Sequence, residues 1–297
     1  MDYYWSKSLG VLASKTPTKK LCKLAVKLFV GSTVLPRSKD LAQTLLTSAA
    51  EHSESLEHLN QVQFSKAYLK KLEGVQEGKP SLLAEGNQEL VRLANESHPA
   101  SMFVMARELI KIRSQMKAYS RNQAEQTAFG YLKKAVELKH TPAYFYMGLA
   151  YEEGIGVEPN MEEAIEYYSY AASENDPQAY FKLAQLKKED AELNFKYTKK
   201  AAELGLLEAQ HNLGVSYLEK GEVKRGFAWQ LEAAKHDFYP SVVNIGCIFL
   251  YGKGEILSNP LAAYIWLCRA QKFENSPQLE ELIRASEEAI KSLKNKA

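Results

Sequence analysis

Small and apolar residues recur with a helical period through the second half of the chain. Four segments of this kind align without gaps: AYFYMGLAY (143–151), AYFKLAQLK (179–187), AQHNLGVSY (209–217) and SVVNIGCIF (241–249). Each begins with alanine or serine and has glycine or alanine five positions later, and the starts lie 36, 30 and 32 residues apart. Three positions further on stands Tyr151, Tyr217 or Phe249, with Lys187 as the exception. The pattern indicates repeated helical units whose small residues let neighbouring helices approach closely.

A second motif closes each unit with a pair of small residues, often with an aromatic residue four positions before it. The pairs are Ala171-Ala172, Ala201-Ala202, Ala233-Ala234 and, less regularly, Arg269-Ala270. The first three pairs each begin eight residues before the next unit, whereas the middle of the unit varies in length. Ala164, Gly226 and Ala262, seven residues before a pair, are expected to make a further close contact. These features predict helix–turn–helix hairpins whose length changes fall in one loop.

Two stretches resemble Sel1-like repeats, which are related to tetratricopeptide repeats. AYFYMGLAYEEGIGVEPNMEEAIEYYSYAASEND (143–176) matches nearly a whole repeat, and YGKGEILSNPLAAYIWLCRA (251–270) matches the second half of another. A Gly-x-Gly turn followed by an alanine-rich aromatic helix carries the resemblance, which covers about residues 141–272. It implies an all-α fold, a right-handed α-solenoid of helix-turn-helix repeats. Sel1-like proteins are similar in serving as adaptors that assemble multiprotein complexes, so the resemblance also implies a binding scaffold.

The pattern weakens upstream but continues. PASMFVMARELI (99–110) aligns with PAYFYMGLAYEE (142–153), and KDLAQTLLTSAAEHS (39–53) has the character of a second helix. We therefore expect five to seven helix pairs from about residue 17 onward, with longer loops only at 74–80 and 118–123. The predicted organisation is a basic segment at 1–40, divergent helical repeats at 41–140, Sel1-like repeats at 141–272 and a C-terminal capping helix at 273–297.

Charge is balanced over the whole chain but not along it. The 38 basic and 36 acidic residues give a net charge of +2, so the protein as a whole does not attract nucleic acid. Eight basic residues nevertheless lie within residues 1–40, where only Asp2 and Asp40 are acidic. Lys19, Lys23 and Lys27 share one face of a predicted helix whose other face is apolar.

An amphipathic, basic and hydroxyl-rich N-terminus is typical of a mitochondrial presequence. Asp2 and the predominance of lysine over arginine speak against that interpretation. The alternatives are the first helix of the first repeat with a solvated lysine face, or peripheral contact with an acidic membrane surface. We expect a mitochondrial location, with a cytoplasmic one as the alternative. No apolar run is long enough to predict a transmembrane helix.

Motifs for catalysis, metals or cofactors are not found in the sequence. Cys22, Cys247 and Cys268 are odd in number and form no CxxC pair, which argues against disulfides and a zinc site. The six histidines have no metal-binding spacing, and no phosphate-binding loop is present. The sequence therefore predicts no catalytic residues, no metal and no cofactor.

Two rows of exposed first-helix positions are the candidate partner-binding residues. In the first row stand Tyr146, Lys182, Asn212 and Asn244, and seven positions later stand Glu153, Glu189, Glu219 and Tyr251. In Sel1-like and related solenoids the first helices line a concave surface, so the resemblance implies that these side chains face a groove. Polar groups in such rows can hydrogen-bond an extended peptide, while aromatic residues pack against it. They are equally compatible with ordinary solvent-exposed helix positions.

The sequence thus predicts a non-enzymatic adaptor that binds a peptide or partner protein on its concave face. The alternative is a mitochondrial assembly or maturation factor, which is the same scaffold with a targeting sequence. A helical-repeat RNA-binding protein is less favoured, because residues 41–297 are net acidic. Some Sel1-like proteins have been proposed to act as hydrolases, but the sequence supplies no nucleophile beside a base.

Overall fold

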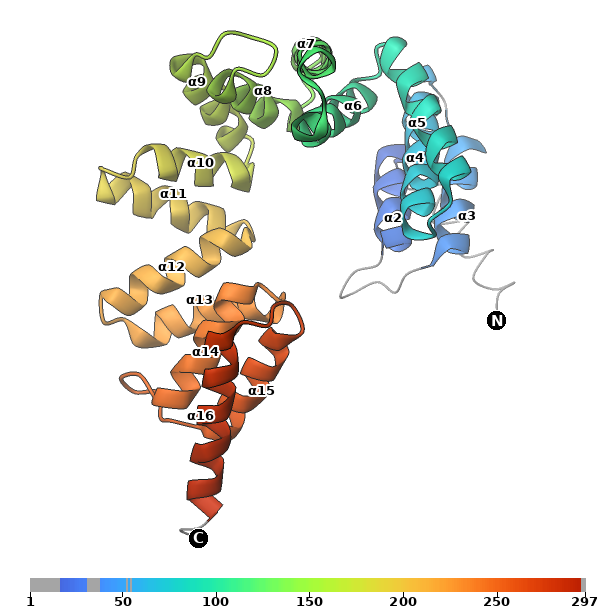
Figure 1. Ribbon diagram of the computed structural model, residues 1–297. Helices are drawn as coiled ribbons and strands as arrows, with labels where there is room; N and C mark the ends of the chain where they lie inside the picture. Colours follow the sequence, from blue (N-terminus) through green and yellow to red (C-terminus); the bar gives the residue numbers. More distant parts are fainter. Residues whose placement is uncertain (1–16, 31–37, 52, 54, 295–297) are drawn as a thin grey trace. The chain divides into compact units, whose positions relative to one another are not determined.

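The computed structural model describes residues 17–30, 38–51, 53 and 55–294, and every regular element among them is a helix (Figure 1). The predicted all-α solenoid class is confirmed. The chain divides into two compact units, Met1–Ala164 (unit 1) and Ile165–Ala297 (unit 2), which are treated separately below.

Unit 1 is built from helix pairs in which consecutive helices pack side by side. Its helices are α2 (Thr18–Val30), α3 (Lys39–Glu51), α4 (Leu56–Gln76), α5 (Pro80–Asn95), α6 (Pro99–Ile112), the short 3-10 helix η1 (Arg113–Gln115), α7 (Ala118–Glu137) and α8 (Pro142–Glu153). The most extensive contacts join α2 to α3, α4 to α5 and α6 to α7. Helix α9 (Met161–Ser173) crosses the division between the units.

Unit 2 continues the same arrangement. Its helices are α10 (Pro177–Leu186), α11 (Ala191–Glu203), α12 (Leu207–Glu219), α13 (Val223–Lys235), α14 (Tyr239–Tyr251), α15 (Pro260–Gln271) and α16 (Pro277–Lys294). Pairs form between α10 and α11, α12 and α13, and α14 and α15, while α16 packs against α15.

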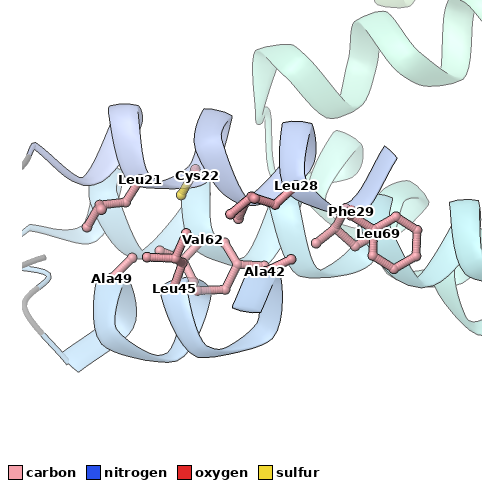
Figure 2. Packing of buried hydrophobic residues seen from close by; sticks show 11 residues of the cluster. Leu21, Cys22, Leu28, Phe29, Ala42, Leu45, Ala49, Val62 and Leu69 are labelled. Carbon is pink, nitrogen blue, oxygen red and sulfur yellow. The ribbon is translucent and has the colours of Figure 1, made fainter. Parts of the chain in front are cut away.

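Helix α2 is held in place by the apolar face that the sequence pattern identifies. Leu21, Leu28 and Phe29 are buried in one cluster with residues of α3 and α4 (Figure 2). Burying an apolar side chain of this size stabilises a fold by roughly 1.5–3 kcal/mol relative to exposing it. The lysines of α2 stay exposed because they occupy the opposite face. Helix α2 is therefore an integral part of the fold of unit 1.

The small residues of both motifs are buried where the helices of unit 2 pack together. Ala179, Ala209 and Ser241 at the unit starts are fully buried, as are the alanines of the closing pairs at 201–202 and 233–234. The expectation for Ala262 is wrong, because Ala262 is half-buried and Ala263 is fully buried instead. The last unit closes on Ala270 alone. The residue seven positions before Ala270 is Ala263, and Ala263 therefore takes the contact position expected for Ala262.

Two glycines bring the backbones of α12 and α13 together. A Cβ atom added to Gly226 would lie 2.7 Å from the carbonyl oxygen of Gly214, and one added to Gly214 would lie 3.0 Å from the carbonyl oxygen of Gly226. Real side chains do not tolerate the shorter contact, so α13 would have to move away from α12. The close approach predicted for these two positions is confirmed.

Edge-to-face aromatic pairs connect one hairpin to the next. Phe129 of α7 meets Tyr151 of α8, Phe195 of α11 meets Tyr217 of α12, and Phe227 of α13 meets Phe249 of α14, with ring centroids 5.6 to 5.7 Å apart. In each pair the first ring lies six residues before a closing alanine. The corresponding positions around α10 are Ile165 and Lys187, so no aromatic pair forms there.

Turns between helices follow their local chemistry. Asn160 Oδ1 accepts hydrogen bonds from the backbone N–H groups of Glu162 and Glu163 at the start of α9. Gly156 has a φ of 71°, and a Cβ there would lie 2.4 Å from the carbonyl oxygen of Glu125, so only glycine fits this turn.

The predicted loops at 74–80 and 118–123 are corrected by the structure. Residues 118–123 form the first turns of α7, and α4 continues to Gln76 before a short turn. Residues 118–123 contain neither glycine nor proline, so nothing there breaks the helix.

Gly226→Ala should destabilise the protein by about 1–3 kcal/mol, because overpacking at the α12–α13 contact exceeds the roughly 1 kcal/mol that alanine gains in helix propensity. Urea unfolding followed by circular dichroism measures the change. Gly130→Ala is the matched control: beyond the backbone of α7 itself, nothing lies within 4 Å of a Cβ added to Gly130, so this variant should gain stability. Equal gains for both variants would contradict the close contact.

Candidate binding groove

Unit 1 contains a groove with a volume of about 1050 Å³. Its lining comes from one face of α2, the first half of α4, the start of α6 with the turn before it, and the turn that leads into α8. These elements are, or lead into, the first helices of successive pairs, which are the helices predicted to line a concave surface. A smaller cavity of about 350 Å³ lies in unit 2 beside α10 and α11.

Aromatic side chains form the apolar part of the groove. Phe64 stacks on Tyr68 with ring centroids 5.8 Å apart. Phe103 meets the edge of Tyr146 at 5.3 Å, and the guanidinium of Arg107 lies 5.8 Å from the centroid of the Phe103 ring. All five side chains are half-buried, so the helices hold them while part of each remains accessible. Aromatic surface of this kind suits packing against apolar side chains of a ligand.

Two histidines lie beside these rings. His98 is 5.2 Å from Phe64 and His140 is 5.4 Å from Phe103, measured between ring centroids. His98 also caps α6, because its ring accepts a hydrogen bond from the backbone N–H of Ser101. Burial lowers the pKa of both histidines, and for His140 the nearby His98 and Lys19 lower the pKa further, to about 4. Both rings are therefore neutral at pH 7.

Comparison with known families finds five matches to the Sel1 repeat. They cover residues 119–140, 141–176, 177–206, 207–236 and 241–270. The chain belongs to the Sel1-repeat family. The first match begins upstream of residue 141, where the resemblance was expected to begin, and it covers α7 from its second residue to its end.

Solved structures support the same fold for this Sel1-repeat protein. A Sel1 repeat protein from Oxalobacter formigenes has a TM-score of 0.60 and 21% identity, over 93% of this chain and 76% of that chain. An immunity protein from Pseudomonas aeruginosa has a TM-score of 0.50 and 18% identity, over 75% of this chain and 85% of that chain. Identities at this level show the fold alone, and no curated protein matches the sequence.

The first predicted row lies on first helices of the Sel1 repeats. Tyr146 is on α8, Lys182 on α10, Asn212 on α12 and Asn244 on α14. Tyr146 contacts the groove through Phe103, and it is the member of the row that belongs to unit 1. In unit 2 Asn212 is exposed, whereas Lys182 and Asn244 are half-buried. A binding role for the three residues of unit 2 stays a prediction.

The second predicted row is less regular. Glu153 ends α8 and forms an ion pair with Arg113, while Glu219 and Tyr251 are the exposed last residues of α12 and α14. Glu189 is not on a helix, because α10 ends at Leu186 and Glu189 lies in the turn that follows. A spacing of seven residues therefore does not place Glu189 on the same face as the others.

Most groove residues were missed by the sequence analysis. Phe103 stands at the position of Tyr146 in the alignment of 99–110 with 142–153, so extending the row upstream would have found it. Phe64 and Tyr68 lie on α4, a helix of 21 residues outside the matched repeats, and no repeat signal points to them.

Cys22 and Cys247 are poorly suited to nucleophilic chemistry. Burial raises the pKa of the Cys22 thiol, which borders the groove, and also that of Cys247. A raised pKa lowers the fraction of reactive thiolate. In the part of the chain that the structure describes, no group of three or more His, Cys, Asp or Glu side chains could hold a metal ion. None of the described helices combines the length and apolar character needed to cross a bilayer.

His140→Phe should make the Sel1-repeat protein less sensitive to acid. The pKa of His140 is about 4 in the folded state against about 6.5 in the unfolded chain, so the unfolded chain takes up the proton first as the pH falls. Between pH 7 and pH 5 the native protein should lose about 1 kcal/mol of stability through this group, after allowance for partial screening by solvent. His140→Phe keeps an aromatic ring and removes that loss.

Urea unfolding at the two pH values measures the difference, with His58→Phe on the exposed start of α4 as the control. If His140→Phe loses as much stability on acidification as the wild type does, the depressed pKa is not a feature of the folded protein.

Proposed function

We propose that this Sel1-repeat protein is a non-enzymatic adaptor that binds a segment of a partner protein in the groove of unit 1, in the assembly of a multiprotein complex. The observation that supports the proposal is the groove itself, whose lining comes from four successive helix pairs and includes accessible aromatic rings. Solenoids bury apolar surface between neighbouring repeats, so their inner face stays available to a ligand.

The size and composition of the groove favour a polypeptide ligand. Its volume of about 1050 Å³ is at the upper limit of ordinary small-molecule pockets. The lining combines apolar rings with lysines and polar side chains over a long surface instead of converging on one point. An extended peptide can place alternate side chains on such a surface, which is a common mode of peptide recognition.

The chemistry of the groove agrees better with binding than with catalysis. Cys22 is the thiol at its border, and burial raises the pKa of that group. His98 uses its ring nitrogen to cap α6 and is hydrogen-bonded to Ser101 instead of to a nucleophile aimed into the groove. Neither group has the arrangement that activates a nucleophile.

Filling the groove should remove the partner while leaving the fold intact. Asn60 is a half-buried residue of α4 in the groove lining, so Asn60→Trp should occupy space that the partner needs. We expect affinity purification with a C-terminal tag, followed by quantitative mass spectrometry, to recover the partner with the wild type and at least about tenfold less with the variant.

Gln88→Trp is the matched control, because Gln88 is exposed on α5 outside the groove. It should retain the partner, and both variants should melt within a few degrees of the wild type. Full recovery of the same partners with a folded Asn60→Trp protein would contradict a binding role for the groove.

We propose a mitochondrial targeting sequence only in the residues before Thr18. Helix α2 buries Leu21, Leu28 and Phe29 against α3 and α4, so cleavage after α2 would expose the apolar faces of those helices. A targeting sequence confined to the preceding residues can be removed without loss of this core or of the proposed adaptor function.

In cells, the protein with a C-terminal tag should co-fractionate with mitochondria, and its mature N-terminus should lie before Thr18. Mass spectrometry of the N-terminal peptide measures this position. An entirely cytosolic distribution would contradict the targeting sequence, and a mature N-terminus beyond Val30 would contradict the role given to α2.

A further inference from the structure

One wall of the groove is a row of lysines on α2. Lys19, Lys23 and Lys27 are exposed, follow one another at intervals of four residues, and line the groove. The apolar cluster beneath α2 fixes this orientation, because it holds the opposite face of the helix against α3 (Figure 2). None of the three lysines forms an ion pair with a carboxylate among the described residues.

The other charges of the groove add to this positive wall. Arg107 on α6 and Lys139 before α8 bring the cationic lining residues to five, against the two carboxylates of Glu57 and Glu96. Glu96 is already paired with Arg92 at 2.6 Å, and Arg107 is paired with Glu108 at 3.6 Å, so the lysines carry most of the remaining charge. The groove is therefore locally cationic in a chain whose net charge is only +2. Charge complementarity of this kind favours an acidic partner.

Phe64 and Phe103 lie on the groove lining supplied by α4 and α6, whereas the lysines come from α2. They can pack against apolar side chains of a ligand, while the neutral His98 and His140 add no positive charge at pH 7. The groove therefore offers one charged wall and one apolar surface to the same bound segment.

We propose that the groove selects an extended acidic segment in which acidic and apolar residues alternate. This inference rests on the proposed adaptor function and adds the chemistry of the partner. Residues four apart on a helix rise by about 6 Å, and alternate residues of an extended chain rise by about 6.6 Å. Acidic side chains at every second position can therefore follow Lys19, Lys23 and Lys27, while the intervening side chains point toward Phe64 and Phe103.

Single-stranded RNA is also anionic, but the rings suit it less well. Bases bind such grooves by stacking on free aromatic faces. One face of Phe64 is covered by Tyr68, with an angle of 13° between the ring planes, and Arg107 lies over a face of Phe103. Arg107 is also the single arginine of the lining, although arginine is the residue best suited to phosphate.

The test uses the purified full chain and fluorescence anisotropy at low and physiological salt. The probe is a labelled peptide of about ten residues, enough to span α2 when extended, in which glutamate alternates with apolar residues. The comparison probes are a peptide of the same composition with glutamates and apolar residues in two separate blocks, a peptide with lysine in place of glutamate, and an oligouridylate. We expect the alternating acidic peptide to bind tightest and to weaken as salt is added.

Lys23→Glu and Lys20→Glu form a matched pair, because both lysines are exposed on α2 and only Lys23 lines the groove. Lys23→Glu should weaken binding of the alternating peptide about tenfold, and Lys20→Glu should leave it within about twofold. Equal effects of the two substitutions, equal binding of the block peptide, or tighter binding of the oligouridylate would each overturn the inference.

The outcome also separates this inference from the proposed function. If Asn60→Trp abolishes partner capture but Lys23→Glu has no effect on it, the groove is the binding site and the acidic partner is wrong. If neither substitution affects capture, the adaptor proposal for the groove fails as well.

Discussion

Two helices can cross with their backbones nearly in contact only where neither has a side chain in the way. This steric constraint organises the repeats, as the crossing of Gly214 and Gly226 shows most directly. The buried alanines at the unit starts and closing pairs meet the same requirement at the other crossings. Because protein interiors are packed to near-crystalline density, the space around each crossing must be filled by side chains of complementary shape. The edge-to-face pairs, such as Phe195 with Tyr217, fill it between one hairpin and the next.

The same constraint explains why one side of the first helices remains available to a ligand. Small residues occupy little volume, so the buried apolar surface is spread along the chain between neighbouring repeats. One side of the first helices therefore stays uncovered. In unit 1 that side carries Phe64, Phe103 and Tyr146, which are half-buried, so part of each ring stays accessible. Ile165 and Lys187 stand where the other hairpins have the regular aromatic pair, and Ile165 is the first residue of unit 2.

Helix α2 shows how one amphipathic pattern can serve two requirements. Its apolar face completes the core of α3 and α4, and burial of that face leaves Lys19, Lys23 and Lys27 in a row on the other side. The pattern alone is equally typical of a targeting helix, because basic amphipathicity says nothing about what covers the apolar face. In the structure the apolar face of α2 is covered by α3 and α4.

The sequence by itself determined the helical class, the repeat family and the positions of close contact. Helix crossings require small residues at regular intervals, and Gly214 and Gly226 are examples. The place of Tyr146 in the repeat also marked it as a candidate; it does not line the groove itself but meets Phe103 of the lining edge to face. Only the tertiary structure brought Phe64, Phe103 and the lysines of α2 to one groove, since these residues are far apart in sequence and α4 carries no repeat signal. It also placed Glu189 in a turn and Ala263 instead of Ala262 in the core, because helix ends and rotations depend on how neighbouring helices pack.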